Sequence, residues 1–291
     1  MQSHSFYSPL RYPGGKGALS NFLKLVLQHN DMLDGHYVEV YAGGAGIAWA
    51  LLFEEYVRYV HINDISRPIN AFWQSVINDT DALCKLIYDT PVTIDEWNQQ
   101  KCVMADVDNQ THLAVGFATF FLNRTNRSGI ITGGVIGGKA QSGQWKLDAR
   151  FNKQDLVARI QRIASYRSRI TLHNKNASDF LKSDLPSFPA KTLVYLDPPY
   201  YIKGQGLYEN YYLPAHHEEI ANLITQSVKH QWIVSYDVTP AILVLYGECR
   251  SIRYSINYSA HERYAGSEIM FFSENLVIPS VSNPVRAKVI I

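Results

Sequence analysis

The fold of this chain is decided by an octapeptide in its C-terminal half, Leu193-Val194-Tyr195-Leu196-Asp197-Pro198-Pro199-Tyr200. Its first four residues have the length and the apolar, β-branched and aromatic character of a buried strand. Two consecutive prolines then end the strand, because proline offers no N–H group to a β-ladder. The octapeptide therefore predicts a strand that places a carboxylate and an aromatic ring at the edge of a sheet. Open α/β folds carry their chemistry at that edge.

The end of the octapeptide has the groups needed to activate an exocyclic amine of an aromatic base. Such an amine is a poor nucleophile, because its lone pair is delocalised into the ring. The Asp197 carboxylate and the Pro198 carbonyl could each accept one N–H and draw the nitrogen toward a tetrahedral geometry. Pro198 and Pro199 fix φ and so hold these acceptors in place, and Tyr200 offers a face for a flipped base. The alternative is a plain Pro-Pro turn with a capping Asp197.

Length and composition predict a globular chain with a sizeable core, since 46% of its 291 residues are hydrophobic and 18% are charged. No apolar run approaches the ~18 residues of a membrane span, and the N-terminus lacks the features of a secretion signal. Cys84, Cys102 and Cys249 lie far apart, which argues against a disulfide framework or a zinc site and fits a reducing cytoplasm. The adjacent His216 and His217 cannot both face one site on a helix, so we expect no metal.

The charge distribution is uneven, although the net charge is only +1. Residues 120–175 contain eleven Lys and Arg but only two acids, Asp148 and Asp155. A basic segment inside a neutral chain indicates a polyanionic partner such as a nucleic acid backbone. The alternative is a solvated helix face. That alternative fits the arginines between 159 and 169 but leaves the glycine-rich stretch 133–138 unexplained.

Two glycine-containing turns near the N-terminus indicate that backbone approaches a ligand. The first is Arg11-Tyr12-Pro13-Gly14-Gly15-Lys16, which leads into an amphipathic helix. It lacks the spacing of a phosphate loop, and a carboxylate would fit that helix N-terminus equally well. The second is Glu39-Val40-Tyr41-Ala42-Gly43-Gly44-Ala45-Gly46, which lies between a predicted strand and a predicted helix.

This strand–turn–helix pattern is typical of the opening of a Rossmann-like unit. The dinucleotide fingerprint G-x-G-x-x-G is absent, so we do not expect a nicotinamide cofactor. About twenty residues further on, Asp64 ends a second predicted strand, where an acid is well placed to accept two ribose hydroxyls. Together these features predict a cofactor that contains a nucleoside.

The alternation of strands and helices lapses between residues 66 and 165, which we interpret as an inserted domain. Helices are predicted over 68–88, 94–105 and 111–123. Glycine-containing turns at 125–130 and 133–138 then predict a β-ribbon flanked by Arg and Lys that could enter a nucleic acid groove.

The α/β pattern resumes after this block. Strands are predicted over 170–173, 193–196, 232–237, 252–255 and 268–272, with a helix over 215–228. An aromatic-rich loop over 201–213 is expected to cover the site. Asp179 and Phe180 could contact a purine, or they could be a helix cap and a core residue. The fold predicted is α/β, with a Rossmann-like sheet in 1–65 and 166–278, the inserted domain in 66–165 and a tail over 279–291.

Taken together, these motifs resemble the Dam-like (D12) N6-adenine DNA methyltransferases with the α order of motifs, from Arg11 to about Ser273. Asp197-Pro198-Pro199-Tyr200 matches the family's catalytic motif letter for letter. The segment 11–16 resembles its N-terminal cofactor motif, and Gly266-Ser267-Glu268 with Arg263 resembles its last conserved block. The segment 39–45 resembles its F-x-G-x-G loop, with Tyr41 and Ala45 as departures.

The resemblance implies a class I S-adenosylmethionine-dependent methyltransferase sheet with a target-recognition domain. It implies a catalytic motif made of Asp197, Pro198, Pro199 and Tyr200. It implies binding of S-adenosylmethionine, with S-adenosylhomocysteine as product, by Tyr12, Gly14, Gly15, Lys16, Glu39, Tyr41, Ala42, Gly43, Gly44, Asp64, Asp179 and Phe180. It also implies DNA contacts by Arg124, Asn126, Arg127, Lys139 and Arg150.

The activity expected from this resemblance is site-specific methylation of N6 of a flipped adenine in double-stranded DNA. Methylation of RNA adenine is an alternative activity, and a methyltransferase-like DNA-binding module without turnover is an alternative of another class. Cytosine N4 and glutamine are less favoured, because those chemistries more often use Ser or Asn in place of Asp197. The target sequence and a cognate restriction endonuclease stay open. We expect a cytoplasmic monomer or weak dimer with no membrane contact.

Overall fold

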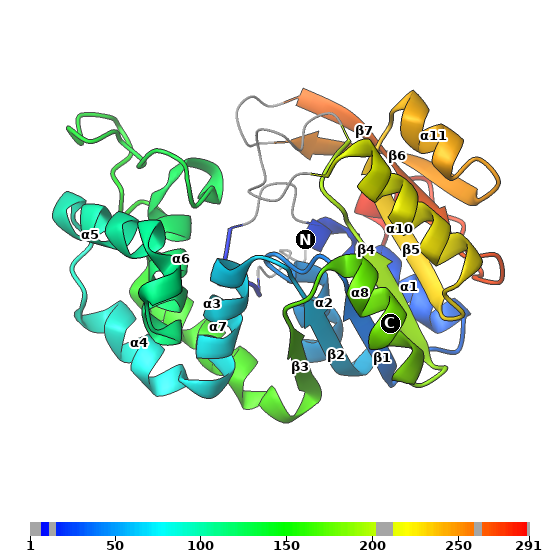
Figure 1. Ribbon diagram of the computed structural model, residues 1–291, viewed down its shortest axis with the longest axis horizontal. Coiled ribbons are helices and arrows are strands. Elements are labelled where there is room, and N and C mark those ends of the chain that lie inside the picture. The colour runs from blue at the N-terminus through cyan, green and yellow to red at the C-terminus, as the bar shows by residue number, and fades with distance from the viewer. Residues whose placement is uncertain (1–6, 12–15, 202–211, 259–263, 290–291) are drawn as a thin grey trace. The chain divides into compact units, whose positions relative to one another are not determined.

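The computed structural model describes residues 7–11, 16–201, 212–258 and 264–289 (Figure 1). The chain divides into two compact units. The first unit comprises Met1–His4, Lys16–Ile65 and Arg169–Ile291, and the second comprises Ser5–Gly15 and Ser66–Ser168. The described residues 7–11 therefore group with the second unit. We describe each unit by itself.

The first unit is built on a seven-stranded sheet with the strand order β3-β2-β1-β4-β5-β7-β6. The strands are β1 (Gly35–Glu39), β2 (Val57–Asn63), β3 (Ile170–His173), β4 (Thr192–Leu196), β5 (Gln231–Asp237), β6 (Arg250–Tyr258) and β7 (Tyr264–Phe272). Strands β1 to β5 pair in parallel, whereas β7 runs antiparallel to both β5 and β6. The predicted α/β fold with a Rossmann-like sheet is confirmed.

The order of the strands fixes where a ligand can bind. From β1 the chain continues to β2 and β3 on one side, whereas β4 and β5 lie on the other side. Val38 pairs with Val194 and Glu39 with Tyr195, so β1 and β4 end at the same edge. Ligands of open α/β sheets bind in the crevice outside such a switch point. The loop after Glu39 and the motif after Leu196 therefore meet at one edge.

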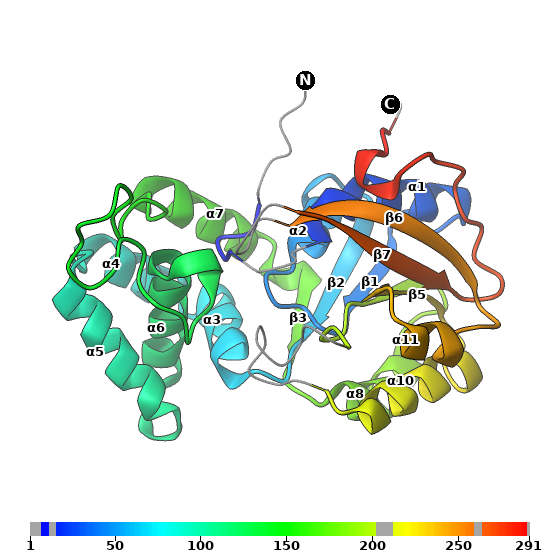
Figure 2. The same ribbon diagram turned by 90° about the horizontal axis from the view of Figure 1, so that it is seen from above.

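Helices cover both faces of this sheet, as Figure 2 shows. One face carries α1 (Ser20–His29) and α2 (Gly46–Phe53), and the other carries α8 (Ala177–Ser183), α10 (Pro214–Gln226) and α11 (Pro240–Leu245). Short 3₁₀ turns complete the unit: η1 (Lys16–Leu19), η4 (Arg167–Arg169), which overlaps its boundary, η5 (Leu185–Ser187) and η6 (Pro284–Arg286).

Alternation along the strands gives the two faces different chemistry. Val38, Val40, Val194 and Leu196 point toward α8, α10 and α11 and join one apolar core with them. The intervening residues of the same strands include Tyr37, Glu39 and Tyr195, which are all buried. Helix α2 is apolar all round and seven of its eight residues are buried, as expected of a helix enclosed by its neighbours.

The second unit is mainly helical. Its helices are α3 (Arg67–Asn78), α4 (Thr80–Asp89), α5 (Ile94–Ala105), α6 (His112–Thr125) and α7 (Lys153–Ser165), with 3₁₀ turns η2 (Val107–Asn109) and η3 (Arg127–Gly129). The single helix predicted over 68–88 is wrong, because the chain leaves helical geometry at Asp79. The N-caps of helices α3, α5, α6 and α7 are Ser66, Thr93, Thr111 and Asn152. In each of them, the side-chain oxygen of the N-cap residue accepts a hydrogen bond from a backbone N–H group in the first turn of the helix.

The β-ribbon predicted after α6 is also wrong. Among the described residues 126–151 the only strand-like pairing is a single antiparallel bridge between Asn126 and Val135. Gly129, Gly137 and Gly138 adopt positive φ, at 77°, 81° and 73°. Left-handed residues interrupt the extended backbone that a ladder requires, so the glycines that suggest strand boundaries instead form successive turns. Among the described residues, no helix is both long and apolar enough to span a membrane.

We predict that Gly116→Ala destabilises the second unit. A Cβ at Gly116 in α6 would lie 2.7 Å from the Ala71 carbonyl oxygen of α3, and it would also meet the hydroxyl of Ser75. Alanine favours a helix by about 1 kcal/mol over glycine, but overpacking typically costs about 1–3 kcal/mol. Urea unfolding should show a net loss of stability. The matched control is Gly134→Ala, since nothing lies within 4 Å of a Cβ there. Equal stability of the two variants would contradict this packing argument.

Candidate active site

A buried lysine lies at the centre of the carboxyl edge of the sheet. Lys16, in η1, is 5% exposed. Its Nζ lies 3.1 Å from Asp197 Oδ1 and 3.4 Å from Glu268 Oε1, and it donates a hydrogen bond of 2.8 Å to the Tyr200 hydroxyl. Burial would lower the pKa of Lys16, but Asp197 and Glu268 outweigh it and raise that pKa well above its ordinary value. The ammonium group therefore stays charged.

Asp197 follows β4 and is held through one of its two oxygens. Oδ1 accepts a hydrogen bond of 2.7 Å from Ser235 Oγ in addition to its contact with Lys16. The Tyr195 hydroxyl lies 2.8 Å from the same serine oxygen. Among the described residues, neither Asp197 Oδ2 nor the Pro198 carbonyl oxygen accepts a hydrogen bond. The side chain of Asp197 is 19% exposed. Two acceptors at the edge of the sheet are thus left for a substrate.

Glu268 in β7 closes the network from the other side. Its Oε1 accepts a hydrogen bond of 2.5 Å from the Tyr200 hydroxyl, and its Oε2 accepts one of 2.5 Å from the Tyr254 hydroxyl in β6. Glu268 is fully buried. Burial raises the pKa of Asp197, Lys16 opposes that rise, and the charge of Glu268 adds to it. One buried cation thus serves the buried carboxylate of Glu268 and the partly exposed carboxylate of Asp197.

Glu39, the last residue of β1, has a carboxylate oxygen without a partner. The residue is 4% exposed, and its Oε1 accepts a hydrogen bond of 3.2 Å from the Tyr37 hydroxyl. Its Oε2 is buried and accepts no hydrogen bond from any described residue. Burial raises the pKa of Glu39 to about 8, against the opposing hydrogen bond from the Tyr37 hydroxyl. A cationic ligand group would supply the missing donor.

The glycine loop after Glu39 is tied to the end of β2. The Gly43 N–H donates a hydrogen bond of 2.8 Å to Asp64 Oδ2. Gly43 and Ala45 adopt positive φ, 45° and 49°, and Ala45 is the N-cap of α2. Alanine accepts this conformation at a cost of about 1–2 kcal/mol. The structure thus brings Asp64 and the loop together as a candidate cofactor cradle.

Three more predicted cofactor residues lie in this loop. Ala42 is buried and donates its N–H to the Asn63 carbonyl oxygen at 2.9 Å. The Tyr41 hydroxyl lies 2.9 Å from the Tyr212 hydroxyl, and Gly44 is buried. Tyr12, Gly14 and Gly15, Arg263 and the loop 202–211 lie outside the described residues.

The second acidic–aromatic pair, Asp179 and Phe180, lies at the start of α8. Phe180 is fully buried, with ring centroids 4.9 Å from His173 and 6.0 Å from Phe188. Its ring belongs to the core of the face covered by α8. Asn176, rather than Asp179, caps α8 by accepting the Ser178 N–H. Asp179 is exposed in the first turn of α8, and the cofactor contacts of Asp179 and Phe180 stay a prediction.

In the second unit, Asn126 has a structural role. It is fully buried. Its Oδ1 accepts the Trp97 indole N–H at 2.6 Å, and its Nδ2 donates to the Ile130 and Ile131 carbonyls at 2.9 and 2.8 Å. Each polar atom of the carboxamide therefore has a partner within the unit, and a DNA contact by Asn126 stays a prediction.

The basic residues of this unit differ in how accessible they are. Arg124 is largely enclosed, and its Nε donates to the Arg150 carbonyl at 2.7 Å. Burial, helped by the nearby charges of Arg11, Arg159 and Arg150, lowers the pKa of Arg124 to about 9. The side chains of Arg127, Lys139 and Arg150 are exposed.

Sequence reasoning missed a link within the second unit. The Asn123 carboxamide accepts the Arg11 N–H at 2.7 Å and donates to the Arg11 carbonyl at 2.7 Å and to the Gly129 carbonyl at 2.8 Å. It thereby binds the start of the 11–16 motif to the end of α6. The partners Ser235 and Tyr254 in the first unit were also missed. The sequence places Glu268 in the last conserved block, and an acid in the otherwise apolar run 268–272 is the signal that could have indicated its contacts with Tyr200 and Lys16.

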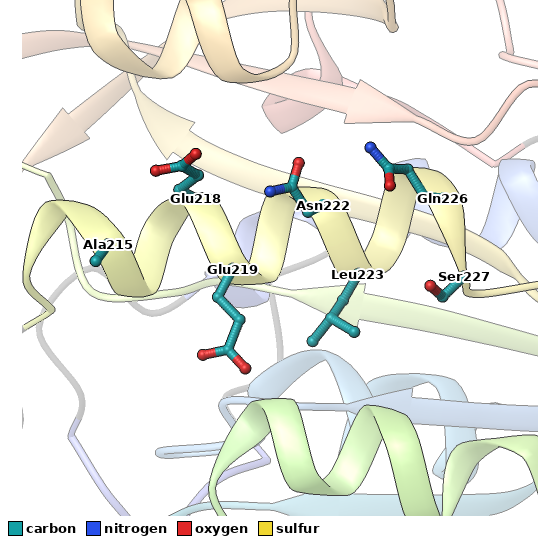
Figure 3. A pocket seen from close by; sticks show the side chains of 7 residues that line it. All are labelled: Ala215, Glu218, Glu219, Asn222, Leu223, Gln226 and Ser227. Atoms are coloured by element: carbon teal, nitrogen blue, oxygen red, sulfur yellow. The ribbon is translucent and has the colours of Figure 1, made fainter.

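A shallow hollow on α10 contains none of the predicted site residues. It is lined along one helix by Ala215, Glu218, Glu219, Asn222, Leu223, Gln226 and Ser227 (Figure 3). Glu219 is already paired with Lys182 at 2.8 Å. Within the described ranges, no group of three or more His, Cys, Asp or Glu residues could hold a metal ion.

Comparison with known families assigns the chain. Residues 12–265 match the model of the D12 class N6 adenine-specific DNA methyltransferases. The chain therefore belongs to that family, and S-adenosylmethionine is its cofactor. No curated protein sequence matches it significantly.

Solved structures with similar folds share little sequence with the chain. A proposed RNA methyltransferase from Pyrococcus horikoshii is 8% identical, with coverage of 88% of this chain and 81% of that one and a TM-score of 0.43. TrmK of M. capricolum, in complex with S-adenosyl-homocysteine, is 7% identical (87% and 71%, TM-score 0.35). The rRNA methyltransferase AviRa of Streptomyces viridochromogenes is 10% identical (86% and 83%, TM-score 0.35). These values carry no argument about substrate.

We predict that, without cofactor, the Glu39→Gln variant gains stability relative to wild type as the pH rises. The folded pKa of Glu39, about 8, exceeds the ordinary value of 4.5. Its contribution to stability is therefore complete below about pH 4.5 and is lost as pH rises through 8. Between pH 5 and 8 the stability of wild type relative to Glu39→Gln should fall by up to about 1.4 kcal/mol per pH unit. Urea unfolding at several pH values measures this slope. The control is the exposed Glu248→Gln, and parallel curves for wild type and Glu39→Gln would contradict the prediction.

Proposed function

We propose that this methyltransferase moves a methyl group from S-adenosylmethionine to N6 of an adenine in duplex DNA, at a specific sequence. The support is the geometry after β4 in a chain of the D12 class. Asp197 Oδ2 and the Pro198 carbonyl oxygen accept no hydrogen bond from any described residue, at the switch point of the sheet. Two adjacent acceptors suit the two N–H groups of an exocyclic amine.

The residues around β1 and β2 fit the cofactor. When bound, S-adenosylmethionine supplies a methyl group activated by a positively charged sulfur. The unpartnered, buried Glu39 Oε2 suits the ammonium group of its amino-acid part. Asp64, at the end of β2, would accept the ribose hydroxyls beside the Gly43 loop. A cation beside Glu39 would also favour the ionised carboxylate, whose pKa burial raises.

Asp197 and Pro198 would prepare the adenine amine. Hydrogen bonds from N6 to Asp197 Oδ2 and Pro198 O would localise the nitrogen lone pair and aim it away from the ring plane. The methyl group of S-adenosylmethionine would pass to N6 as its bond to sulfur breaks, and the positive charge would move from the sulfur to N6. The charged N6 would then lose one of its two protons to water. Lys16 and Ser235 hold Oδ1, so they orient Asp197 and favour its ionised form while charge develops on N6.

Tyr200 would support the base from one side. Its hydroxyl is fixed between Lys16 at 2.8 Å and Glu268 at 2.5 Å. A ring held at its far end offers a defined plane against which an extruded adenine could stack. Positioning and oriented acceptors would supply most of the rate, so no strong base is required.

The deciding experiment is transfer from labelled S-adenosylmethionine to mixed-sequence duplex DNA, followed by digestion and separation of the nucleosides. We expect label in N6-methyldeoxyadenosine. Asp197→Ala should lower the rate by at least about 10³-fold, because it removes an oriented acceptor, while cofactor affinity changes less than about threefold. RNA is assayed in parallel. Label in RNA alone would contradict the DNA substrate, and cofactor binding without any transfer would favour a binding module.

A second prediction separates DNA contacts from scaffold residues in the second unit. Arg127→Ala, Lys139→Ala and Arg150→Ala should each weaken DNA binding and lower the slope of log affinity against log salt by about 1, as expected for the loss of one phosphate contact. Asn126→Ala should leave that slope unchanged and lower the unfolding free energy by about 1–3 kcal/mol, because its buried partners lose their hydrogen bonds. Fluorescence anisotropy and urea unfolding measure the two effects. A salt slope unchanged in all three basic variants would contradict this assignment.

A further inference from the structure

Glu268 is an ionisable residue in an apolar strand. It precedes Ile269, Met270, Phe271 and Phe272, which are all buried. In the sheet register it lies opposite Tyr254 of β6 and Asp237 of β5. Burying a carboxylate costs several kcal/mol unless hydrogen bonds and an opposite charge compensate. A strand that needed only packing would be served by an apolar residue, so the contacts of Glu268 call for an explanation.

These contacts are directed at the catalytic motif. One oxygen receives the Tyr200 hydroxyl at 2.5 Å, and the other receives the Tyr254 hydroxyl at 2.5 Å. The first oxygen also lies 3.4 Å from Lys16 Nζ. Because Tyr254 occupies the second oxygen, the plane of the carboxylate is set. The first oxygen is thereby aimed at Tyr200.

We propose that Glu268 is a positioning residue for methyl transfer and that it acts through Tyr200 and Lys16. Together with Tyr254 it holds the Tyr200 hydroxyl, and with it the ring against which the adenine stacks. It also shares the Lys16 ammonium with Asp197, and so sets how strongly Lys16 holds Asp197 Oδ1. This inference rests on the proposed methylation of adenine and deepens it.

The ring of Tyr200 has little freedom in this arrangement. Its hydroxyl donates to Glu268 and accepts from Lys16, and the residue is 4% exposed. Rotation of the ring about its last side-chain bond leaves the hydroxyl in place, but any tilt breaks both short contacts. Misplacement of a reacting group by about 1 Å can cost about 10²-fold in rate. Loss of the Glu268 contact should therefore reduce the chemical step more than it reduces binding.

The charge of Glu268 has a second consequence, for the ionisation of Asp197. Burial raises the pKa of Asp197, Lys16 lowers it, and Glu268 raises it. Other titratable groups also lie close to Asp197, Glu268 or Lys16. These groups are Tyr37 and Glu39 on β1, Tyr195 on β4 and Tyr254 on β6. Removal of the Glu268 charge alone leaves these groups in place. The pKa of Asp197 should then fall. Because activity needs the ionised Asp197, the pH below which activity is lost should fall as well.

The test compares Glu268→Gln, Tyr200→Phe and the double variant with wild type by single-turnover methyl transfer to a duplex that wild type methylates. The matched control is Glu219→Gln, an exposed glutamate on α10. Glu268→Gln should lower the transfer rate by about 10²-fold, with cofactor and DNA dissociation constants within about threefold of wild type. The acidic limb of its pH–rate profile should shift to lower pH. The fold-loss of transfer rate in the double variant should be much smaller than the product of the two single fold-losses. The reason is that each single change already removes the same contact, between the Tyr200 hydroxyl and Glu268.

Four results would overturn the proposal: an unchanged rate in Glu268→Gln, independent effects of the two changes, an equal loss in Glu219→Gln, or an unshifted acidic limb. If Glu268→Gln fails to fold, Tyr254→Phe takes its place, since it keeps the charge and removes one hydrogen bond. A reduced transfer rate at unchanged affinity then supports the proposal, and a wild-type rate overturns it. Absence of transfer by wild type on both DNA and RNA would instead overturn the proposed function.

Discussion

The site depends on the placement of one buried ammonium group between two carboxylates, one buried and one partly exposed. Lys16 comes from a short 3₁₀ turn at the start of the first unit, whereas Asp197 follows β4 and Glu268 lies in β7. Without the cation, two carboxylates this close would not both stay ionised in a buried environment. A lysine suits the position because its compact head carries three donors, which can serve three separate oxygens. The described contacts are a hydrogen bond to Tyr200 and ion pairs with Asp197 and Glu268.

The topology of the sheet explains why the network and the cofactor residues meet. Strands β1 and β4 are neighbours, and Glu39 pairs with Tyr195 in their register. The glycine loop follows the first strand and Asp-Pro-Pro-Tyr follows the second, so both lie at the carboxyl edge. Glu39 and Asp197 are close enough to interact, since the charge of Asp197 adds to the rise in the pKa of Glu39. Binding of a cation at this edge would relieve both carboxylates.

Local pattern made the sheet and its motifs predictable, because strand periodicity, the paired prolines and the glycine turn are encoded in contiguous residues. Long-range placement was not predictable in the same way. Glu268 reaches Tyr200 only because β7 is inserted between β5 and β6. Asn126 sits beside arginines in the sequence, but its carboxamide is consumed by Trp97 and two carbonyls. Phe180 is one residue from an exposed acid, yet the helix turn directs it into the core. The glycines near 137 adopt left-handed turns, so they interrupt a ribbon that their spacing suggests.

The dependence of the catalytic motif on Lys16 can be measured directly as the pKa of Asp197. Carbon-13 NMR of aspartate-labelled protein, with Asp197→Asn to assign the signal, reports this pKa in wild type and in Lys16→Met. Methionine keeps most of the side-chain volume and removes the charge. Because Lys16 is the largest influence that lowers the pKa of Asp197, the pKa should rise in Lys16→Met, and methyl transfer at neutral pH should fall with it. An unchanged pKa would contradict the central role of the buried lysine.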